Sequence, residues 1–176
     1  MQMFVLDANP ARSARCLCDA HVRVIGREIT MCLSAWYAKH MGHAEELPYK
    51  PFNHPIADQF DNEAARMWAV HNTLFIFHEF EYRFGKQHAS EAKYNQLLQY
   101  RIKYHDAPLC VPTENALFTY VGIDTLPIPG RTIIRNLSIN QAVNLYRHYY
   151  AVKLQYMRVP VTYTGNHKPE WLEEPE

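Results

Sequence analysis

Apolar residues near the start of the chain recur with the period of an α-helix. From residue 18 onward they appear at intervals of three and four positions, which places them on one face of a helix. These positions are Cys18, Val22, Ile25, Ile29, Cys32 and Trp36. Because Ser13 is a suitable N-cap residue, we expect one continuous helix from Ser13 to about Ala38.

Turn and cap residues divide the middle of the chain into further helices. The tripeptide Asn-His-Pro at 53–55 is typical of a helix start, since proline fits the first turn. The helical pattern that follows, with a break near Asp61, extends to Phe84, and Gly85 suits the position after a helix end. Ser90 is expected to cap a third helix that ends near Tyr104.

A capping box begins the last predicted helix. The segment 138–141, Ser-Ile-Asn-Gln, places a hydroxyl residue three positions before a glutamine, so that each side chain can bond the other residue's backbone N–H. The helix is expected to run to about Arg158 and to end before Pro160.

The remaining segments lack a helical period. Met3 to Leu6 is a short apolar segment that we expect to be extended. Residues 105–137 are rich in proline and predict an irregular loop, and residues from about 160 to 176 form a C-terminal tail. The 176 residues therefore predict an all-α protein, a single compact helical domain with a short N-terminal extended segment.

Composition excludes several classes of protein. With 48% hydrophobic residues but no long apolar run, the chain is typical of a globular protein that does not enter a membrane. The N-terminus has no basic leader or apolar signal core, so we expect a cytoplasmic location, in the host if the protein is phage-encoded. The four cysteines predict free thiols rather than a disulfide framework.

Ten histidines raise the question of a metal site. His40 with His43, or Cys16 with Cys18, would need distant partners to complete the four ligands of a structural zinc. We therefore expect neither a metal nor a cofactor, with a structural zinc as the alternative.

Charge is distributed unevenly, although the formal net charge is zero. The segment from Gly130 to Lys168 holds basic residues and neither aspartate nor glutamate. Its cations are Arg131, Arg135, Arg147, Lys153, Arg158 and Lys168. A locally positive face attracts phosphate even on a neutral molecule.

Ionisable side chains interrupt the apolar stripe of the first predicted helix. His21 and Glu28 are seven residues apart, which at 1.5 Å of rise per residue is roughly 10 Å along one helix face, and Arg27 is adjacent. Partly apolar surroundings raise the pKa of a carboxyl group toward the range useful for acid–base catalysis, and a neighbouring cation opposes this. A second interpretation stays open, in which Glu28 forms a structural ion pair and His21 lies at the edge of the core.

The last predicted helix combines cations with aromatic rings. Arg and Lys neutralise phosphate, while Tyr stacks on bases or bonds phosphate oxygens, so the mixture suits a DNA backbone with exposed bases. The other interpretation is that the tyrosines are core contacts and the cations form a solvated face. The residues concerned are Tyr146, Arg147, His148, Tyr149, Tyr150 and Lys153.

Taken together, these segments resemble the small all-α family of phage endonuclease V-type pyrimidine dimer DNA glycosylases. Residues 19–28 match the spacing of the Asp, His and Arg-Glu motif on that family's first helix. Segment 79–85 is similar to its helix ending in Arg-Gly, and segment 146–153 to its aromatic and basic DNA-contacting segment. Residues 4–7, 18–22 and 53–55 also resemble an uncharacterised phage protein family.

The resemblance implies roles for individual residues. Glu28 corresponds to the catalytic carboxylate, and His21 and Arg27 to residues that contact DNA phosphate and the reaction centre. The residues expected to contact DNA are Asp19, Arg23, Tyr146, Arg147, Tyr149, Tyr150 and Lys153. The family's nucleophile is the α-amine of an N-terminal Thr, whereas this chain begins Met1-Gln2, so we expect base excision through water without the lyase step.

The sequence thus predicts a DNA glycosylase-like hydrolase that acts on damaged or modified bases in duplex DNA. Two alternatives stay open. One is a non-catalytic DNA-binding descendant of the same fold. The other is an enzyme that acts on free nucleotides in phage DNA metabolism, which the zero net charge suits better. Salt-dependent duplex binding separates the third function from the first two, and base release separates the first from the second.

Overall fold

The computed structural model describes residues 3–50, 55–105, 116–124, 130–166 and 168–172. This part of the chain is a mostly helical single domain with a small hairpin, which confirms the predicted fold class. Its α-helices are α1 (Pro10–Arg15), α2 (Asp19–Val22), α3 (Ile25–Met41), α4 (Glu63–Phe84), α5 (Glu91–His105) and α6 (Ile139–Gln155). The strands are β1 (Phe118–Asp124) and β2 (Gly130–Leu137), and the short 3-10 helices are η1 (Ala44–Glu46), η2 (Pro55–Phe60) and η4 (Glu170–Leu172).

The prediction of one helix from Ser13 to Ala38 is wrong, because this segment forms parts of three helices. α1 begins earlier than predicted, and Asn9 caps it by accepting two backbone N–H bonds with its side chain. Ser13 instead lies inside α1 and is buried. Its hydroxyl accepts the N–H of Leu6 at 3.0 Å and donates to the carbonyl of Phe4 at 3.3 Å, which ties the N-terminal segment to α1.

Side chains from distant helices hold the break between α1 and α2. Arg83 of α4 donates to the carbonyl oxygens of Arg15 at 3.1 Å and Leu17 at 2.7 Å. The N–H of Cys18 donates to the hydroxyl of Tyr150 on α6 at 2.9 Å. These bonds satisfy backbone groups that a continuous helix would pair internally. Because these partners are far away in sequence, the spacing of apolar residues in this segment does not indicate the break between α1 and α2.

A second break separates α2 from α3 at Arg23 and Val24. His88 donates from Nε2 to the carbonyl of Arg23 at 2.9 Å. Directly after the break, Gly26 brings α3 close to α4, since a Cβ atom there would lie 2.8 Å from the ring of Phe77. The close packing of α3 and α4 therefore depends on glycine at position 26, which has no Cβ atom.

The later helices begin where their caps predict. Asn62 caps α4 after the expected break, and Gly85 follows its end with φ 63°. α5 begins directly after Ser90. The capping box of α6 is present, and this helix ends at Gln155, earlier than the expected Arg158. Of the predicted start at 53–55, residues 53 and 54 lie outside the described residues.

The prediction of an irregular loop over 105–137 is wrong for its second part. β1 and β2 form an antiparallel hairpin in which Phe118 lies opposite Leu137. The register shifts between Phe118 and Tyr120, near Asn136 with φ 59°, a conformation that Asn tolerates better than most residues. β-Branched and aromatic residues at 118–123 and 132–134 are the sequence signal that favours these strands. Residues 106–115 and 125–129 lie outside the described residues.

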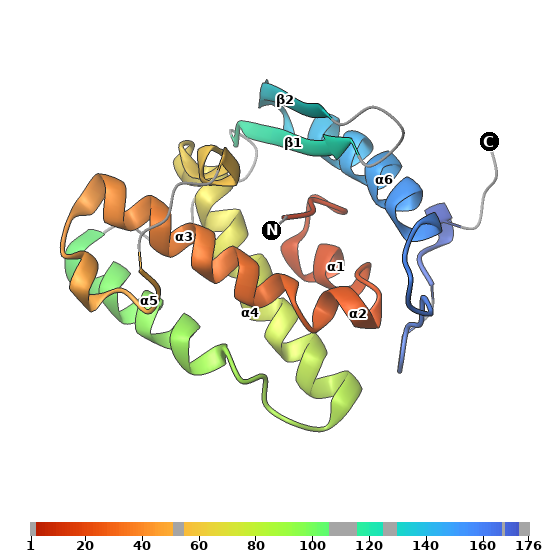
Figure 1. Ribbon diagram of the computed structural model, residues 1–176, viewed down its shortest axis with the longest axis horizontal. Coiled ribbons are helices and arrows are strands. Elements are labelled where there is room, and N and C mark those ends of the chain that lie inside the picture. The colour runs from red at the N-terminus through yellow and green to blue at the C-terminus, as the bar shows by residue number, and fades with distance from the viewer. Residues whose placement is uncertain (1–2, 51–54, 106–115, 125–129, 167, 173–176) are drawn as a thin grey trace.

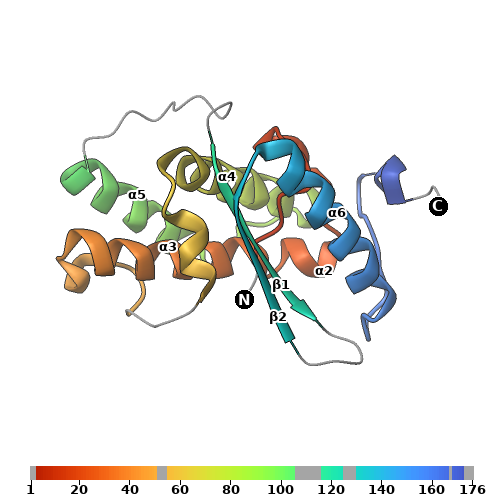
Figure 2. The ribbon, with the colours of Figure 1, turned by 90° about the horizontal axis from the view of Figure 1, so that it is seen from above.

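Figures 1 and 2 show how these elements are arranged. α3 packs on α4 and α5, and α5 lies on the opposite side of the molecule from α6. The hairpin packs against η2 and α6. Residues 3–6 enter the core without forming a strand and are at most 1% exposed, which confirms the predicted N-terminal extended segment.

The C-terminal segment returns to the domain after α6 (Figure 1). The N–H of Asp19 donates to the carbonyl of Thr162 at 2.9 Å, and the hydroxyl of Tyr82 donates to the carbonyl of Gly165 at 3.2 Å. The described part of the predicted tail is therefore bonded to α2 and α4.

Candidate functional site

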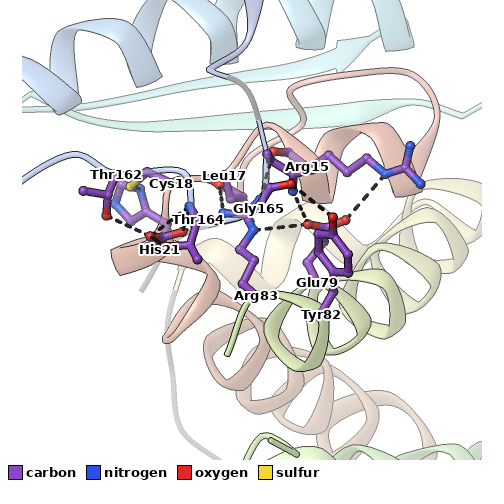
Figure 3. Close-up of polar contacts among 12 residues, drawn as sticks. Arg15, Leu17, Cys18, His21, Glu79, Tyr82, Arg83, Thr162, Thr164 and Gly165 are labelled. Carbon is purple, nitrogen blue, oxygen red and sulfur yellow. Dashed lines mark hydrogen bonds and ion pairs between the residues drawn. The ribbon is translucent and has the colours of Figure 1, made fainter. Parts of the chain in front are cut away.

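Asp19 and Arg83 form a polar contact between α2 and α4. Figure 3 shows Arg83 near Thr162 and Thr164 of the C-terminal segment, which bond the same Asp19 carboxylate. The Arg83 side chain is fully buried and donates to the Asp19 carboxylate at 3.2 Å. The same carboxylate accepts the hydroxyl of Thr162 at 2.8 Å and both the N–H and the hydroxyl of Thr164, the latter at 2.6 Å. Arg83 also bonds Glu79 at 3.2 Å.

These contacts give Asp19 a structural role. Burial on its own would raise the pKa of its carboxyl group, but the hydrogen bonds from Thr164, Thr162 and Arg83 outweigh burial and lower the pKa. Asp19 is 6% exposed, and its oxygens are occupied by internal donors. The sequence expectation that Asp19 contacts DNA therefore has no support in its surroundings.

His21 is buried beside α6. Its Nδ1 atom lies 2.8 Å from the hydroxyl of Tyr150 and 3.4 Å from the sulfur of Cys18. Because that hydroxyl accepts the N–H of Cys18, its own proton is available to Nδ1, which leaves the proton of neutral His21 on Nε2. Burial lowers the pKa of His21 to about 4, and the positive charge of Lys153 adds to this effect. His21 is therefore a neutral imidazole at physiological pH.

Lys153 of α6 reaches over the N-terminal segment. Its Nζ atom lies 5.6 Å from the centre of the Phe4 ring and 6.0 Å from that of Tyr149. The side chain is half-buried, and burial lowers the pKa of its amine, while the negative charge of Glu28 partly opposes this. In the part of the chain that the structure describes, neither a hydrogen bond nor a salt bridge occupies Nζ.

Glu28 lies in the first turn of α3 and is half-buried. Its negative charge acts on Lys153 and on Cys32, whose thiol pKa is raised to about 12 mainly by burial. Glu28 also has further polar partners of its own. We call Glu28, Lys153, His21, Phe4 and Tyr149 the Glu28–Lys153 centre.

This centre corrects the geometry predicted from sequence. His21 and Glu28 do not share one helix face, because the break at Arg23 and Val24 places them on α2 and α3. Arg27 and Arg23 are exposed, and Arg23 lies 3.9 Å above the ring of Phe84. The charge of Lys153 acts on His21, and the charge of Glu28 acts on Lys153, whereas both arginines lie on the surface.

The aromatic residues of α6 mostly fill the core, as the second interpretation of that helix expected. Tyr146, Tyr149 and Tyr150 are at most 9% exposed. Tyr146 bonds the side chain of Gln59, and Phe4 packs edge-on against Tyr150. None of the three tyrosines presents its ring for stacking on an exposed base.

Arg147 is bonded within the protein. It donates from Nε to the carbonyl of Leu6 at 2.8 Å, lies 3.6 Å from Asp7 and packs over the ring of Trp171. A pocket of about 320 Å³ opens beside it, between α1, α6 and the C-terminal segment. Its lining includes Asp7, Arg12, Arg15, Cys16, Arg147 and Trp171. No sequence pattern indicates this pocket, because Trp171 is distant in sequence from the residues of α1 that line it.

Two other pockets lie away from the predicted site. One of about 450 Å³ is lined by η1 and α5 residues, and one of about 280 Å³ lies beside the hairpin. Near the first, ligand atoms of His43, Glu45 and Glu46 lie within 4.8 Å of one another, but Glu46 already bonds Lys103 at 2.9 Å and the hydroxyl of Tyr104. Cys16, Cys18 and Cys32 are free thiols as predicted, and Cys110 lies outside the described residues.

No protein-family model, curated protein or solved structure matches the chain. The resemblance to the endonuclease V-type glycosylases therefore stays a prediction, carried by the residues named for it above. Among the described residues, none of the helices has the length and apolar character needed to span a membrane.

Proposed function

We propose that the protein removes damaged or modified bases from DNA, with Glu28 as the catalytic carboxylate. One observation carries the proposal: the half-buried carboxylate of Glu28 on α3 lies within electrostatic range of the half-buried amine of Lys153 on α6. Two opposite charges in partly apolar surroundings interact more strongly than in water. Such sites are candidates for acid–base and electrostatic catalysis.

The chemistry of base excision fits this pair. Breaking an N-glycosidic bond leaves positive charge on the sugar, and a fixed carboxylate stabilises that charge. Glu28 supplies the carboxylate. His21 is neutral and therefore adds no positive charge beside Lys153.

Exposed cations on the surface supply contacts to the DNA backbone. Arg23 directly after α2, Arg27 in α3, and Arg158 and Lys168 in the C-terminal segment are exposed. Each cation that neutralises a phosphate releases counterions, so these residues support duplex binding that weakens with salt.

The alternative of a free nucleotide as substrate is favoured by a different observation. The pocket beside Arg147 combines guanidinium groups of Arg12 and Arg15 with the indole of Trp171. These groups suit a phosphate and a flat base.

One experiment tests the proposal against this alternative. DNA duplexes whose pyrimidines are damaged by ultraviolet light, deaminated, alkylated or hydroxymethylated are incubated with the full chain. The free bases released are measured by chromatography. The matching deoxynucleoside monophosphates are tested in parallel. We expect base release from one class of duplex only, and a product from monophosphates alone would favour the alternative.

A further inference from the structure

We propose that the pocket beside Arg147 binds a nucleoside monophosphate, and that the bound nucleotide fastens the C-terminal segment to α1. The pocket shares no lining residue with the Glu28–Lys153 centre. The inference concerns binding, and it holds whether or not the chain converts the bound nucleotide. It therefore assigns a second site and does not rest on the proposed function.

Two parts of the chain that are distant in sequence form the walls of this pocket. Arg12, Arg15 and Cys16 line it from α1, and Glu170 and Trp171 line it from the C-terminal segment. Its volume of about 320 Å³ is at the small end of the range of small-molecule sites, which suits one nucleotide better than two. A ligand that fills the pocket contacts both walls.

The guanidinium groups of the pocket differ in how far other residues already engage them. A nitrogen of Arg147 lies 3.6 Å from a carboxylate oxygen of Asp7. Arg15 lies 3.5 Å from the carboxylate of Glu79, a contact drawn in Figure 3. Arg12 is exposed, and among the described residues neither a hydrogen bond nor a salt bridge engages its guanidinium. Arg12 therefore has donors available for a bidentate bond to phosphate.

The other ionisable groups of the lining leave the pocket cationic. Its carboxylates are those of Asp7, which Arg147 offsets, and of Glu170, which is exposed. Burial raises the pKa of the Cys16 thiol, so this thiol is neutral at pH 7 and adds no negative charge. Three guanidinium groups thus line the pocket with two carboxylates, and the excess positive charge favours a phosphate.

Trp171 supplies a flat surface for the base. Its side chain is half-buried, and the guanidinium carbon of Arg147 lies 5.2 Å from the centre of its ring. The ring centre of Tyr150 lies 6.4 Å from that of Trp171. These contacts position the indole from the side of α6, while the indole also lines the pocket. Because every base has a π-face, we expect little discrimination between bases.

A nucleotide that contacts both walls links its own binding to the position of the C-terminal segment. That segment is otherwise held on α2 and α4, through bonds to Asp19 and from Tyr82. A ligand that binds only while Trp171 is in place makes release of the segment rarer by mass action. Trypsin cutting after the exposed Arg158 measures this release.

Calorimetric titration of the full chain with dTMP, thymidine and inorganic phosphate tests the site. We expect one dTMP to bind per chain, and thymidine and phosphate each to bind about 10-fold more weakly or less, because each makes only part of the contacts. Arg12→Gln should weaken dTMP binding about 10-fold. Glu170→Gln removes a repelling carboxylate and should tighten binding about threefold.

Lys39→Gln is the matched control, because it removes one exposed positive charge that does not line the pocket. Its affinity for dTMP should equal that of the wild type. Near-saturating dTMP should slow trypsin cutting after Arg158 in the wild type, and at the same dTMP concentration it should protect Arg12→Gln less.

The inference is overturned if dTMP does not bind, or if thymidine or phosphate alone binds as tightly as dTMP. Wild-type affinity in Arg12→Gln would also overturn it, and so would a cutting rate that bound dTMP leaves unchanged. Base release from duplexes without dTMP binding contradicts only this inference. Binding of dTMP without base release contradicts only the proposed function.

Discussion

His21 shows how one buried residue couples folding to pH. Its pKa is lowered to about 4 in the folded protein, from an ordinary value of 6.5. The neutral form is therefore favoured by folding, so its contribution to stability is complete above pH 6.5 and is lost as the pH falls toward 4. A histidine that gains a carboxylate partner has a raised pKa and stabilises the protein at low pH, so the pH dependence that His21 causes has the opposite sign.

We expect the wild-type protein to lose about 2 kcal/mol of unfolding free energy between pH 6.5 and pH 5 through His21 alone. His21→Gln should be less stable at pH 7 and should lose this part of the pH dependence. Urea unfolding at several pH values measures both quantities. Equal pH dependence in the variant and the wild type would show that His21 is not held neutral.

The amine of Lys153 should be less basic than that of an exposed lysine, even without DNA. We expect formaldehyde and cyanoborohydride at pH 7 to methylate Lys153 faster than exposed Lys93, because burial lowers the pKa of Lys153. Glu28→Gln should lower that pKa further, since the Glu28 charge raises it. The extent of methylation, measured by peptide mass spectrometry as a function of pH, gives the pKa of Lys153. An unchanged pKa in Glu28→Gln would contradict the electrostatic interaction between Glu28 and Lys153.

At the scale of elements, the Asp19–Arg83 contact fixes the C-terminal segment against α2 and α4. Asp19→Asn keeps the shape but removes one of the two carboxylates that pair with the buried Arg83 guanidinium, the other being that of Glu79. We expect a loss of roughly 1–3 kcal/mol in unfolding free energy. Thr164→Ala removes one hydrogen bond to the same carboxylate and should cost about 1 kcal/mol.

Limited proteolysis separates a local effect from global unfolding. Trypsin should cut after Arg158 faster in Asp19→Asn than in the wild type under native conditions, because the segment that follows Arg158 is held less firmly. Equal cutting rates, together with equal unfolding free energies, would contradict the structural role of Asp19.

The helices were predictable where their ends depend on neighbouring residues. Gly85 ends α4 and the capping box at Ser138 begins α6 through residues only a few positions apart, and the structure confirms both helix ends. The breaks on either side of α2 were not predictable, because Arg83, Tyr150 and His88 hold them from other elements. The hairpin was missed because prolines before β1 and between the strands outweighed its β-branched residues.

At the scale of the whole molecule, charge is neutral in sum and cationic only in patches. The candidate site could be predicted in part: Glu28 and His21 were found from their place beside an apolar stripe. The role of Lys153 depends on burial against Phe4, a contact between the two ends of the chain. No local pattern reveals such a contact.

Duplex binding should weaken steeply as salt rises. We expect Arg27→Ala to flatten the slope of log affinity against log salt by about one, because one phosphate contact is lost. Lys39→Ala is the control, since Lys39 is also exposed on α3 but lies in its last turn. A slope that neither substitution changes would place the DNA elsewhere on the molecule.

The most direct test of the account is the single-turnover rate of base release by Glu28→Gln on the duplex that the wild type processes. The amide keeps the shape but loses the charge, so we expect the rate to fall about 100-fold or more while DNA affinity stays within a few-fold. Glu63→Gln, in the first turn of α4, should leave the rate unchanged. A wild-type rate in folded Glu28→Gln would contradict the central claim.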